Sequence, residues 1–197
     1  RMSDNVPEQK RKATAMADRQ EPQSIDIVIL GAGYGGVSCA SRLSRKFRRN
    51  PHVRIHLVDR HTYHLLETRL HERAVREAEV TVPISRFLAK RPAGGEPRMI
   101  SYDYLVIALG SKTNFYQIPG LEEHAFQLKE LEDSESIREH TDRMFATAAS
   151  ISDVEHRKDY LRFVIGGGGL TGVELATEMA ERFDALCEDY KIDHREP

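Results

Sequence analysis

A glycine-rich pattern, G-x-G-x-x-G, occurs twice in this chain of 197 residues and constrains its fold more than any other feature. The first copy lies in DIVILGAGYGG, residues 26–36, and the second in FVIGGGGLTGVE, residues 163–174. Each copy follows an apolar segment typical of a buried parallel strand and precedes a segment with the apolar spacing of a core-facing helix. Because a strand, a glycine turn and a helix in this order form a phosphate-binding unit, the sequence predicts an α/β fold with two dinucleotide-binding turns.

The three glycines of the first copy each have a distinct predicted role. Gly31 permits the tight turn, Gly33 lets the backbone approach a pyrophosphate, and Gly36 lets the helix pack on the strand. The following helix would offer the phosphates its N–H groups and its partial positive charge. Asp59 ends the next apolar segment, where an acid would bind ribose hydroxyls. The adjacent Arg60 would suit a ribose with a 2′-phosphate. We favour Asp59, and so a ribose with a free 2′-hydroxyl.

The second copy uses Gly167, Gly169 and Gly172. No second strand ending in an acid follows it in the printed sequence, so judged alone it is half of a motif. Two such turns in one chain suggest two dinucleotides. The economical pair is a tightly held flavin and an exchangeable nicotinamide, which passes hydride to the flavin.

The apolar pattern also predicts the remaining elements. Strands are expected at 24–30, 53–60, 101–111 and 160–166, with a charged linker at 151–159. Helices are expected from the first turn to about 47, near 71–76, after Pro83, at 133–150 with Asp133 or Ser134 as cap, and from the second turn to about 190. The core-facing stripes of the last two helices are predicted as Ile137, His140, Met144 and Ala148, and as Val173, Ala176, Ala180, Phe183 and Cys187.

Composition excludes several classes of protein. A formal net charge of −2 gives no electrostatic basis for binding nucleic acid. No apolar run approaches the roughly 20 residues that span a bilayer, and the start of the chain has no signal-peptide core. Cys39 and Cys187 are too far apart in sequence to indicate a disulfide framework or a zinc site, and Cys39 is expected to be a small buried apolar residue. The spacing of His61, His64 and His71 predicts no metal site.

Four segments together resemble one family: VILGAGYGGVSCASRL, HLVDRHTYHLLETRLHERA, YDYLVIALGS and FVIGGGGLTGVELATEMAER. They are similar to the type II NADH dehydrogenases, the single-subunit NADH:quinone oxidoreductases, within the two-dinucleotide flavoproteins related to disulfide reductases. The resemblance covers nearly all of residues 24–190. It implies two Rossmann-like domains, one for FAD and one for NADH.

The resemblance also implies which residues form the sites. Glu174 corresponds to a family glutamate near the nicotinamide and flavin. The alternative is that Glu174 has no role in the reaction and is an acid that the helix dipole favours near the start of the helix. The FAD residues would be Gly31, Gly33, Gly36 and Asp59, with Arg60 adjacent and His64, Thr68, Ala108 and Gly110 near the flavin; Gly167, Gly169 and Gly172 would hold NADH.

On this basis the chain is expected to have a flexible tail (1–22), the N-terminal part of an FAD domain (23–118), and a connector with the start of an NADH domain (119–197). The FAD domain would lack a hairpin between Pro92 and Ala93, and the NADH domain would be truncated.

The expected function is transfer of hydride from NADH to flavin and of electrons to a quinone, at the cytoplasmic side of the cell membrane or in the cytoplasm. The membrane contact would be peripheral. A homodimer is a further candidate assembly. Alternatives are another flavoprotein reductase, of ferredoxin, rubredoxin or sulfide:quinone type, or a non-catalytic nucleotide-binding redox module. The absence of a cysteine pair disfavours a dithiol reductase and the sulfide:quinone type.

Overall fold

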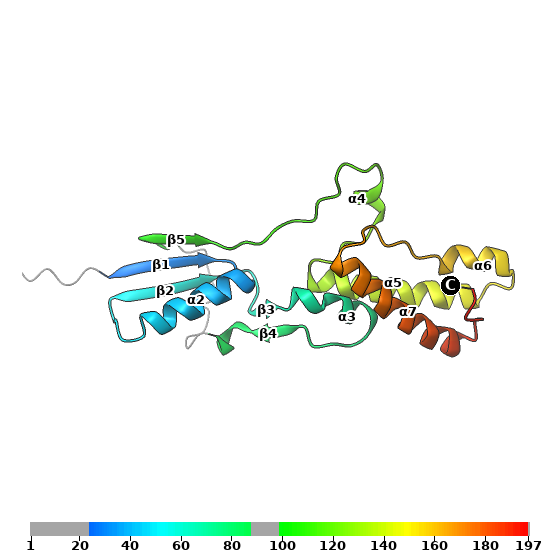
Figure 1. Ribbon diagram of the computed structural model, residues 1–197, viewed down its shortest axis with the longest axis horizontal. Helices are drawn as coiled ribbons and strands as arrows, with labels where there is room; N and C mark the ends of the chain where they lie inside the picture. The colour runs from blue at the N-terminus through cyan, green and yellow to red at the C-terminus, as the bar shows by residue number, and fades with distance from the viewer. Residues whose placement is uncertain (1–23, 88–98, 197) are drawn as a thin grey trace, which may run out of the picture. The chain divides into compact units, whose positions relative to one another are not determined.

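The computed structural model describes residues 24–87 and 99–196, and they divide into two compact units (Figure 1). Unit 1 contains residues 24–62, 87 and 99–109, and unit 2 contains residues 63–86 and 110–196. Residues 63–86 thus pack with the C-terminal helices, although the strands of unit 1 flank them in sequence. The domain boundary between residues 118 and 119 stays a prediction. The predicted tail and the predicted gap between Pro92 and Ala93 lie outside the described residues.

Unit 1 is a three-stranded parallel sheet in the order β2-β1-β5, with one helix packed on it (Figure 1). Buried Ile27 and Ile29 of β1 pack against Ala40 of the helix, and Ile29 and Ala40 are fully buried. The four elements are β1 (Ile25–Leu30), α2 (Tyr34–Lys46), β2 (Val53–Val58) and β5 (Tyr104–Ile107). This βαβ arrangement confirms the predicted α/β fold class.

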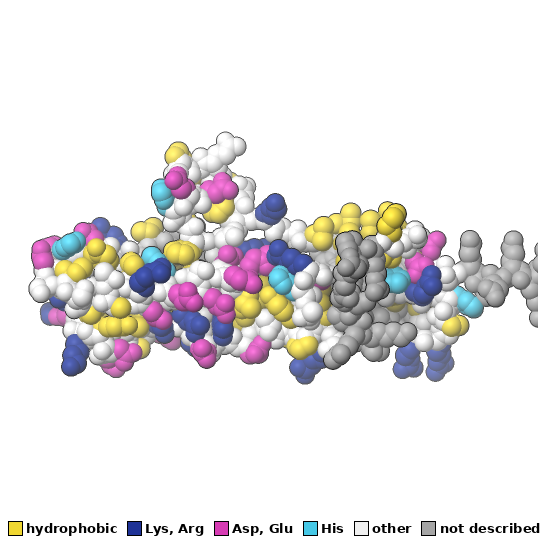
Figure 2. Space-filling model, turned by 180° about the vertical axis from the view of Figure 1, so that it is seen from behind, with side chains coloured by type: hydrophobic (Ala, Val, Ile, Leu, Met, Phe, Trp, Pro, Cys, Tyr) yellow, Lys and Arg dark blue, Asp and Glu magenta, His cyan; other side chains and the backbone are white. Residues whose placement is uncertain are grey.

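Strand β5 is shorter than the predicted strand at 101–111 and lies at the edge of the sheet. Its side chains are largely exposed, and hydrophobic side chains gather along it (Figure 2). The exposed apolar residues in and beside this strand are Met99, Ile100, Tyr102, Tyr104, Leu105, Ile107 and Leu109. No described element of unit 1 pairs with the outer edge of β5.

Unit 2 consists mainly of helices, with a short two-stranded antiparallel sheet (Figure 1). Helix α3 packs against α5 and α7, and α5 also packs against α6. The elements are β3 (Tyr63–Leu65), η1 (Glu67–Arg69), α3 (Leu70–Val75), β4 (Thr81–Pro83), η2 (Ile84–Arg86), α4 (Leu121–His124), α5 (Leu131–Ala149), α6 (Val154–Leu161) and α7 (Leu170–Tyr190). The helix predicted near 71–76 is confirmed. The one after Pro83 is a single 3₁₀ turn. Within the described ranges, no helix is both long and apolar enough to cross a membrane.

The core of unit 2 surrounds the fully buried Phe145. Its ring centroid lies 5.3 Å from that of Phe183 and 6.3 Å from that of Phe163. Leu161 and Cys187 complete the buried centre. Large aromatic side chains from three segments therefore hold α5, α6 and α7 together.

The buried stripe of α5 differs from the predicted one. Glu130, rather than Asp133 or Ser134, is the N-cap, and the Asp133 carboxylate accepts a hydrogen bond from the Glu130 N–H in a capping box. The buried residues are Ser134, Ile137, Thr141, Phe145 and Ala148. His140 and Met144 were predicted in this stripe and are only half-buried, because burial of the larger Phe145 rotates the stripe.

Helix α7 ends where predicted, and only the C-terminal part of its predicted stripe reaches the core. Val173, Ala176 and Ala180 are exposed, whereas Met179, Leu186 and Cys187 are buried. The helix enters the aromatic core through its C-terminal half. Its apolar residues in the first two turns therefore lie outside that core.

Two predictions between α5 and α7 are wrong. The supposed linker at 151–159 contains α6, whose N-cap Asp153 accepts a hydrogen bond from the Glu155 N–H. The supposed strand at 160–166 does not form, and Val164 is 87% exposed. A strand requires a hydrogen-bonded neighbour, and no described segment pairs with this one.

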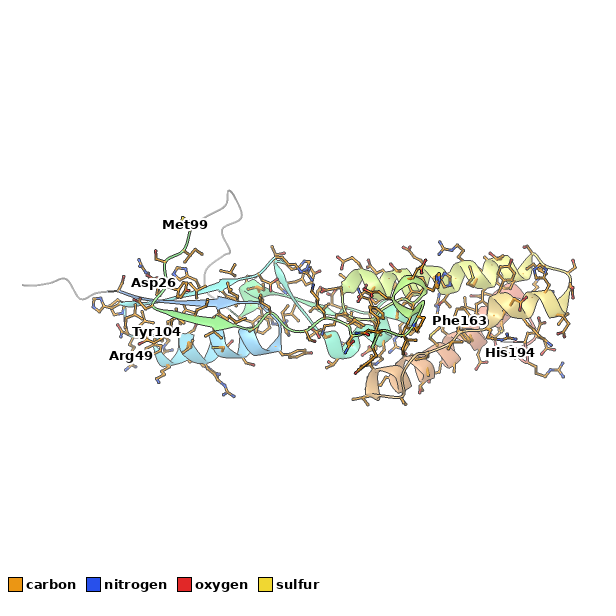
Figure 3. The ribbon with its side chains drawn as sticks, turned by 90° about the horizontal axis from the view of Figure 1, so that it is seen from above. Asp26, Arg49, Met99, Tyr104, Phe163 and His194 are labelled. Atoms are coloured by element: carbon orange, nitrogen blue, oxygen red, sulfur yellow. The ribbon has the colours of Figure 1, made fainter. Side chains whose placement is uncertain are left out.

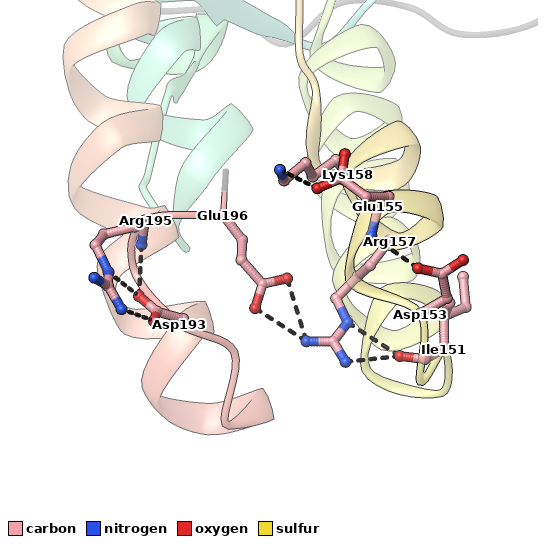
Figure 4. A network of polar contacts seen from close by, with 8 residues as sticks. All are labelled: Ile151, Asp153, Glu155, Arg157, Lys158, Asp193, Arg195 and Glu196. Carbon is pink, nitrogen blue, oxygen red and sulfur yellow. Dashed lines mark hydrogen bonds and ion pairs between the residues drawn. The ribbon is translucent and has the colours of Figure 1, made fainter.

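The charged residues that suggested a linker instead attach α6 to its surroundings (Figure 4). Arg157 donates to the carbonyl oxygen of Ile151 and to the carboxylate of Glu196, at 2.7 and 3.0 Å. Both side chains of the Arg157–Glu196 pair are largely buried. The pair therefore fastens the segment after α7 to the start of α6.

A matched pair of leucine substitutions tests this core. Leu161 is 2% exposed and Leu170 is 76% exposed. We expect Leu161→Ala to lower the free energy of unfolding by about 2–5 kcal/mol, because it leaves a cavity. Leu170→Ala should change it by less than about 0.5 kcal/mol. Urea denaturation measures both, and equal effects would contradict this core.

An acid-dependent contribution is expected in unit 1. Asp26, at the amino end of the sheet (Figure 3), accepts hydrogen bonds from Arg54 and His56, and these partners lower its pKa to about 2. A lowered folded-state pKa stabilises the fold above about pH 4, and this contribution is lost as the pH falls towards 2. The stability deficit of Asp26→Asn should therefore shrink between about pH 5 and about pH 3 in urea denaturation. A constant deficit over that range would count against the pairing.

Candidate functional site

The first glycine turn is closed by backbone contacts that leave no room for side chains at two positions. Gly31 has φ +99°, and a Cβ there would overlap the carbonyl oxygen of Ala108. A Cβ on Gly36 would overlap the carbonyl oxygen of Gly31. Around Gly33, in contrast, a Cβ would meet nothing within 4 Å. The fold therefore requires glycine at positions 31 and 36. Gly33 lies beside open space, which a turn needs if its backbone is to approach a pyrophosphate.

The second turn repeats the contact between third and first glycines, although a Cβ on Gly167, unlike one on Gly31, would meet nothing within 4 Å. Gly167 has φ +137°, and a Cβ on Gly172 would overlap the Gly167 carbonyl oxygen. A Cβ on Gly169 would meet nothing within 4 Å. The turn forms although the segment before it is not a strand, so its shape is set locally.

The helices after the two turns begin without side-chain caps. The N-caps are Gly33 for α2 and Gly169 for α7, and neither helix has an acid in its first turn. Helices α5 and α6 do carry acidic caps, Glu130 and Asp153. The two helix ends at the glycine turns thus carry no acidic cap of their own, which suits an anionic ligand.

Asp59 is fixed against the first turn. Its Oδ2 accepts a hydrogen bond from the Ala32 N–H at 2.6 Å, and its Oδ1 accepts one from the His61 N–H at 2.8 Å. The residue is otherwise exposed, as is the adjacent Arg60. A carboxylate oriented by backbone groups at the turn retains lone pairs that can accept ribose hydroxyls.

The structure divides the predicted flavin residues between the two units. Gly31, Gly33, Gly36, Asp59, Arg60 and Ala108 belong to unit 1. His64, Thr68 and Gly110 belong to unit 2, where His64 is 4% exposed in β3 and Gly110 has φ +76°. The approach of these three residues to a flavin stays a prediction.

A cavity of about 790 Å³ lies beside the second turn, within unit 2. The turn forms one wall, and the connector and α5 contribute an aromatic pair, Phe126 and His140, with ring centroids 4.9 Å apart. Burial, assisted by Arg143, lowers the pKa of His140 and so favours the uncharged imidazole. The glycines in the wall are Gly166, Gly167, Gly169 and Gly172.

Glu174 does not line this cavity, although Gly172, Leu175 and Met179 of the same helix do. Its carboxylate instead lies 3.5 Å from Nδ1 of His71 on α3. One turn further along α7, Glu178 pairs with Arg76, which also contacts Glu72.

The sequence analysis missed this pairing of Glu174 with His71. The available signal was the i, i+4 spacing of Glu174 and Glu178, which places two carboxylates on one helix face. Such a face requires polar or cationic partners.

The cysteines have no redox partner in this arrangement. Cys187 is buried, and burial raises the pKa of its thiol. Cys39 is partly buried against the core of unit 1, somewhat less so than predicted. Over residues 24–87 and 99–196, no three His, Cys, Asp or Glu side chains form a group that could hold a metal ion.

A parallel sheet, two matched glycine turns and two uncapped helix ends define a dinucleotide-binding α/β protein. The family model for pyridine nucleotide-disulphide oxidoreductases matches residues 80–189, more than half of the chain. The chain belongs to this family. The resemblance noted in the sequence is thereby confirmed, because the curated relatives it matches are type II NADH:quinone oxidoreductases.

One of these relatives, from Staphylococcus epidermidis, is 26% identical over 187 residues, covering 85% of this chain and 46% of that protein. The chain therefore spans less than half the length of the curated relatives it matches. A structure of NDH2 from Plasmodium falciparum in complex with NADH has 25% identity and a TM-score of 0.72, covering 86% of this chain and 39% of that one. A sulfide:quinone oxidoreductase from Aquifex aeolicus shares the fold at 24% identity and a TM-score of 0.50, covering 62% of this chain and 33% of that one.

Paired alanine substitutions in each turn separate ligand binding from folding. We expect Gly33→Ala and Gly169→Ala to leave stability close to wild type, because their Cβ atoms meet nothing. Each should weaken nucleotide binding at its own turn by about tenfold or more, because the added methyl occupies the space beside the backbone. Gly36→Ala and Gly172→Ala should instead destabilise the fold. Thermal melting measures stability, bound-flavin content measures binding at the first turn, and NADH titration measures binding at the second. Unaltered binding in the first pair would contradict the assignment.

Proposed function

We propose that the complete protein is an FAD-dependent NADH:quinone oxidoreductase. Two turns of the same geometry, each with an open second glycine and an uncapped helix, support two dinucleotides in one chain. The names of its relatives support NADH as donor and a quinone as acceptor. Bound FAD would supply the two-electron centre that takes hydride from NADH and returns electrons to the quinone.

The first turn is assigned to FAD and the second to NADH. The observation that carries the first assignment is Asp59, held by the Ala32 N–H beside the turn. There it would orient a ribose, while the start of α2 would face the pyrophosphate. At the second turn, Gly167, Gly169 and Gly172 and the start of α7 would hold the NADH pyrophosphate. His64, Thr68, Ala108 and Gly110 would border the flavin.

Glu174 would act at the ring end of the NADH site. It lies in the second turn of α7 and is not among the residues that line the cavity. A carboxylate beside the phosphates would repel them, whereas one directed elsewhere can orient a ligand without that cost. The proposed role is to position the nicotinamide for hydride transfer.

The acceptor is proposed to be a quinone met at a membrane surface, with the protein bound peripherally on the cytoplasmic side. Quinones with long apolar tails partition into lipid, which supports such a position. A homodimer stays open. The shared fold of the sulfide:quinone oxidoreductase gives that class some support, but the partly buried Cys39 and the buried Cys187 offer no accessible thiol pair for sulfide chemistry.

The direct test uses the purified complete protein. NADH added without oxygen should bleach the flavin absorbance, and a soluble quinone should restore it. A flavin that NADH leaves oxidised would overturn the proposal. Reduction by NADH without reoxidation by quinone would assign another acceptor, such as ferredoxin or rubredoxin.

Glu174→Gln tests the role of the carboxylate. We expect it to slow flavin reduction by NADH by about tenfold, with the FAD content unchanged, because the substitution keeps the size and removes the charge. Stopped-flow absorbance measures the rate. A wild-type rate would remove Glu174 from the mechanism.

A further inference from the structure

We propose that His71 is a positioning residue that holds the Glu174 carboxylate in its working orientation, an inference that rests on the proposed function. The two residues come from different helices of unit 2, α3 and α7. Nδ1 of His71 lies 3.5 Å from Oε2 of Glu174. Among the described residues, His71 is the one side chain that makes a polar contact with this carboxylate.

The exposure of the two side chains indicates which positions the other. Glu174 is 36% exposed, so its flexible side chain has several rotamers available, whereas His71 is 13% exposed. The imidazole is therefore held by packing, and the carboxylate is not. A fixed partner at one oxygen selects among the orientations that the carboxylate could otherwise adopt.

Helix α3 is itself firmly held, so His71 has a defined place. Leu70 and Ala74, on either side of it in sequence, are almost completely buried. Arg73 donates to Glu135 of α5 at 2.8 Å. Arg69 pairs with Glu72 through two hydrogen bonds of 2.7 and 2.8 Å, and it lowers the pKa of Glu72 to about 2. The Arg69–Glu72 pair closes the first turn of α3, and the buried residues and the Arg73–Glu135 contact hold the helix against its neighbours.

The same two helices are joined a second time by Arg76 and Glu178. This pair lies one helical turn along α7 from Glu174 and does not involve that carboxylate. If His71 merely tied α3 to α7, loss of either pair would have a similar effect. If His71 orients Glu174, only its loss would change the reaction.

The experiment is a double-substitution cycle in the complete flavoprotein. The readouts are the limiting rate of flavin reduction by NADH and the NADH concentration at half-maximal rate, both from stopped-flow absorbance. The variants are His71→Ala, His71→Asn, His71→Gln and Arg76→Ala, each with Glu174 intact and with Glu174→Gln. Thermal melting and FAD content are recorded for every variant.

We expect His71→Ala to lower the limiting rate by about tenfold when Glu174 is intact and to have no further effect beside Glu174→Gln. His71→Asn should restore much of the rate, because its amide nitrogen reaches the position of Nδ1. His71→Gln, whose amide lies farther out, should restore less. Arg76→Ala should lower the melting temperature and leave the limiting rate within about twofold of wild type.

Three results would overturn the inference. The first is a His71→Ala variant that keeps the wild-type rate of flavin reduction. The second is a His71→Ala substitution that lowers this rate by the same factor whether residue 174 is Glu or Gln. If His71→Ala loses its FAD, the comparison of His71→Asn with His71→Gln tests the inference instead. Equal rates of flavin reduction in these two variants would be the third result. A wild-type flavin that NADH does not reduce would overturn the proposed function and this inference together, whereas normal reduction beside an unaffected His71→Ala overturns only the inference.

Discussion

The contact between the third glycine and the carbonyl oxygen of the first governs both candidate sites. Gly36 meets Gly31, and Gly172 meets Gly167, with no space for a side chain in either pair. This close approach makes each helix begin directly beside the turn. The second glycine, Gly33 or Gly169, is then left facing open space. One set of backbone contacts thus places an uncapped helix end where phosphates can reach it.

The elements predicted well are those whose signals are local. Strands β1 and β2, helix α2 and the end of α7 follow from apolar periodicity and glycine chemistry within each segment. The strand at 160–166 failed because its hydrogen bonds depend on a neighbour that is distant in sequence, and no described segment supplies one. Helix α6 was missed because its sequence is charged, although Asp153 caps it well.

The candidate sites show the same limit. The close backbone contacts of Gly31 and Gly36 and the position of Asp59 beside the turn could be predicted, because the motif fixes the backbone. The contact of Glu174 with His71 could not, because it depends on how α3 packs against α7. The buried stripe of α5 was predicted only in part, with His140 and Met144 in place of Thr141 and Phe145. Two overlapping stripes satisfy the same periodicity. Packing of Phe145 decides between them.

The central claim is that one chain binds two dinucleotides through two equivalent turns. The most direct measurement is the nucleotide stoichiometry of the complete protein, from the flavin released on denaturation and from titration with NADH under anaerobic conditions. We expect each chain to retain one FAD and to bind one further NADH without displacing it. A single nucleotide site per chain, for which NADH and FAD compete, would show that the two turns do not bind two dinucleotides.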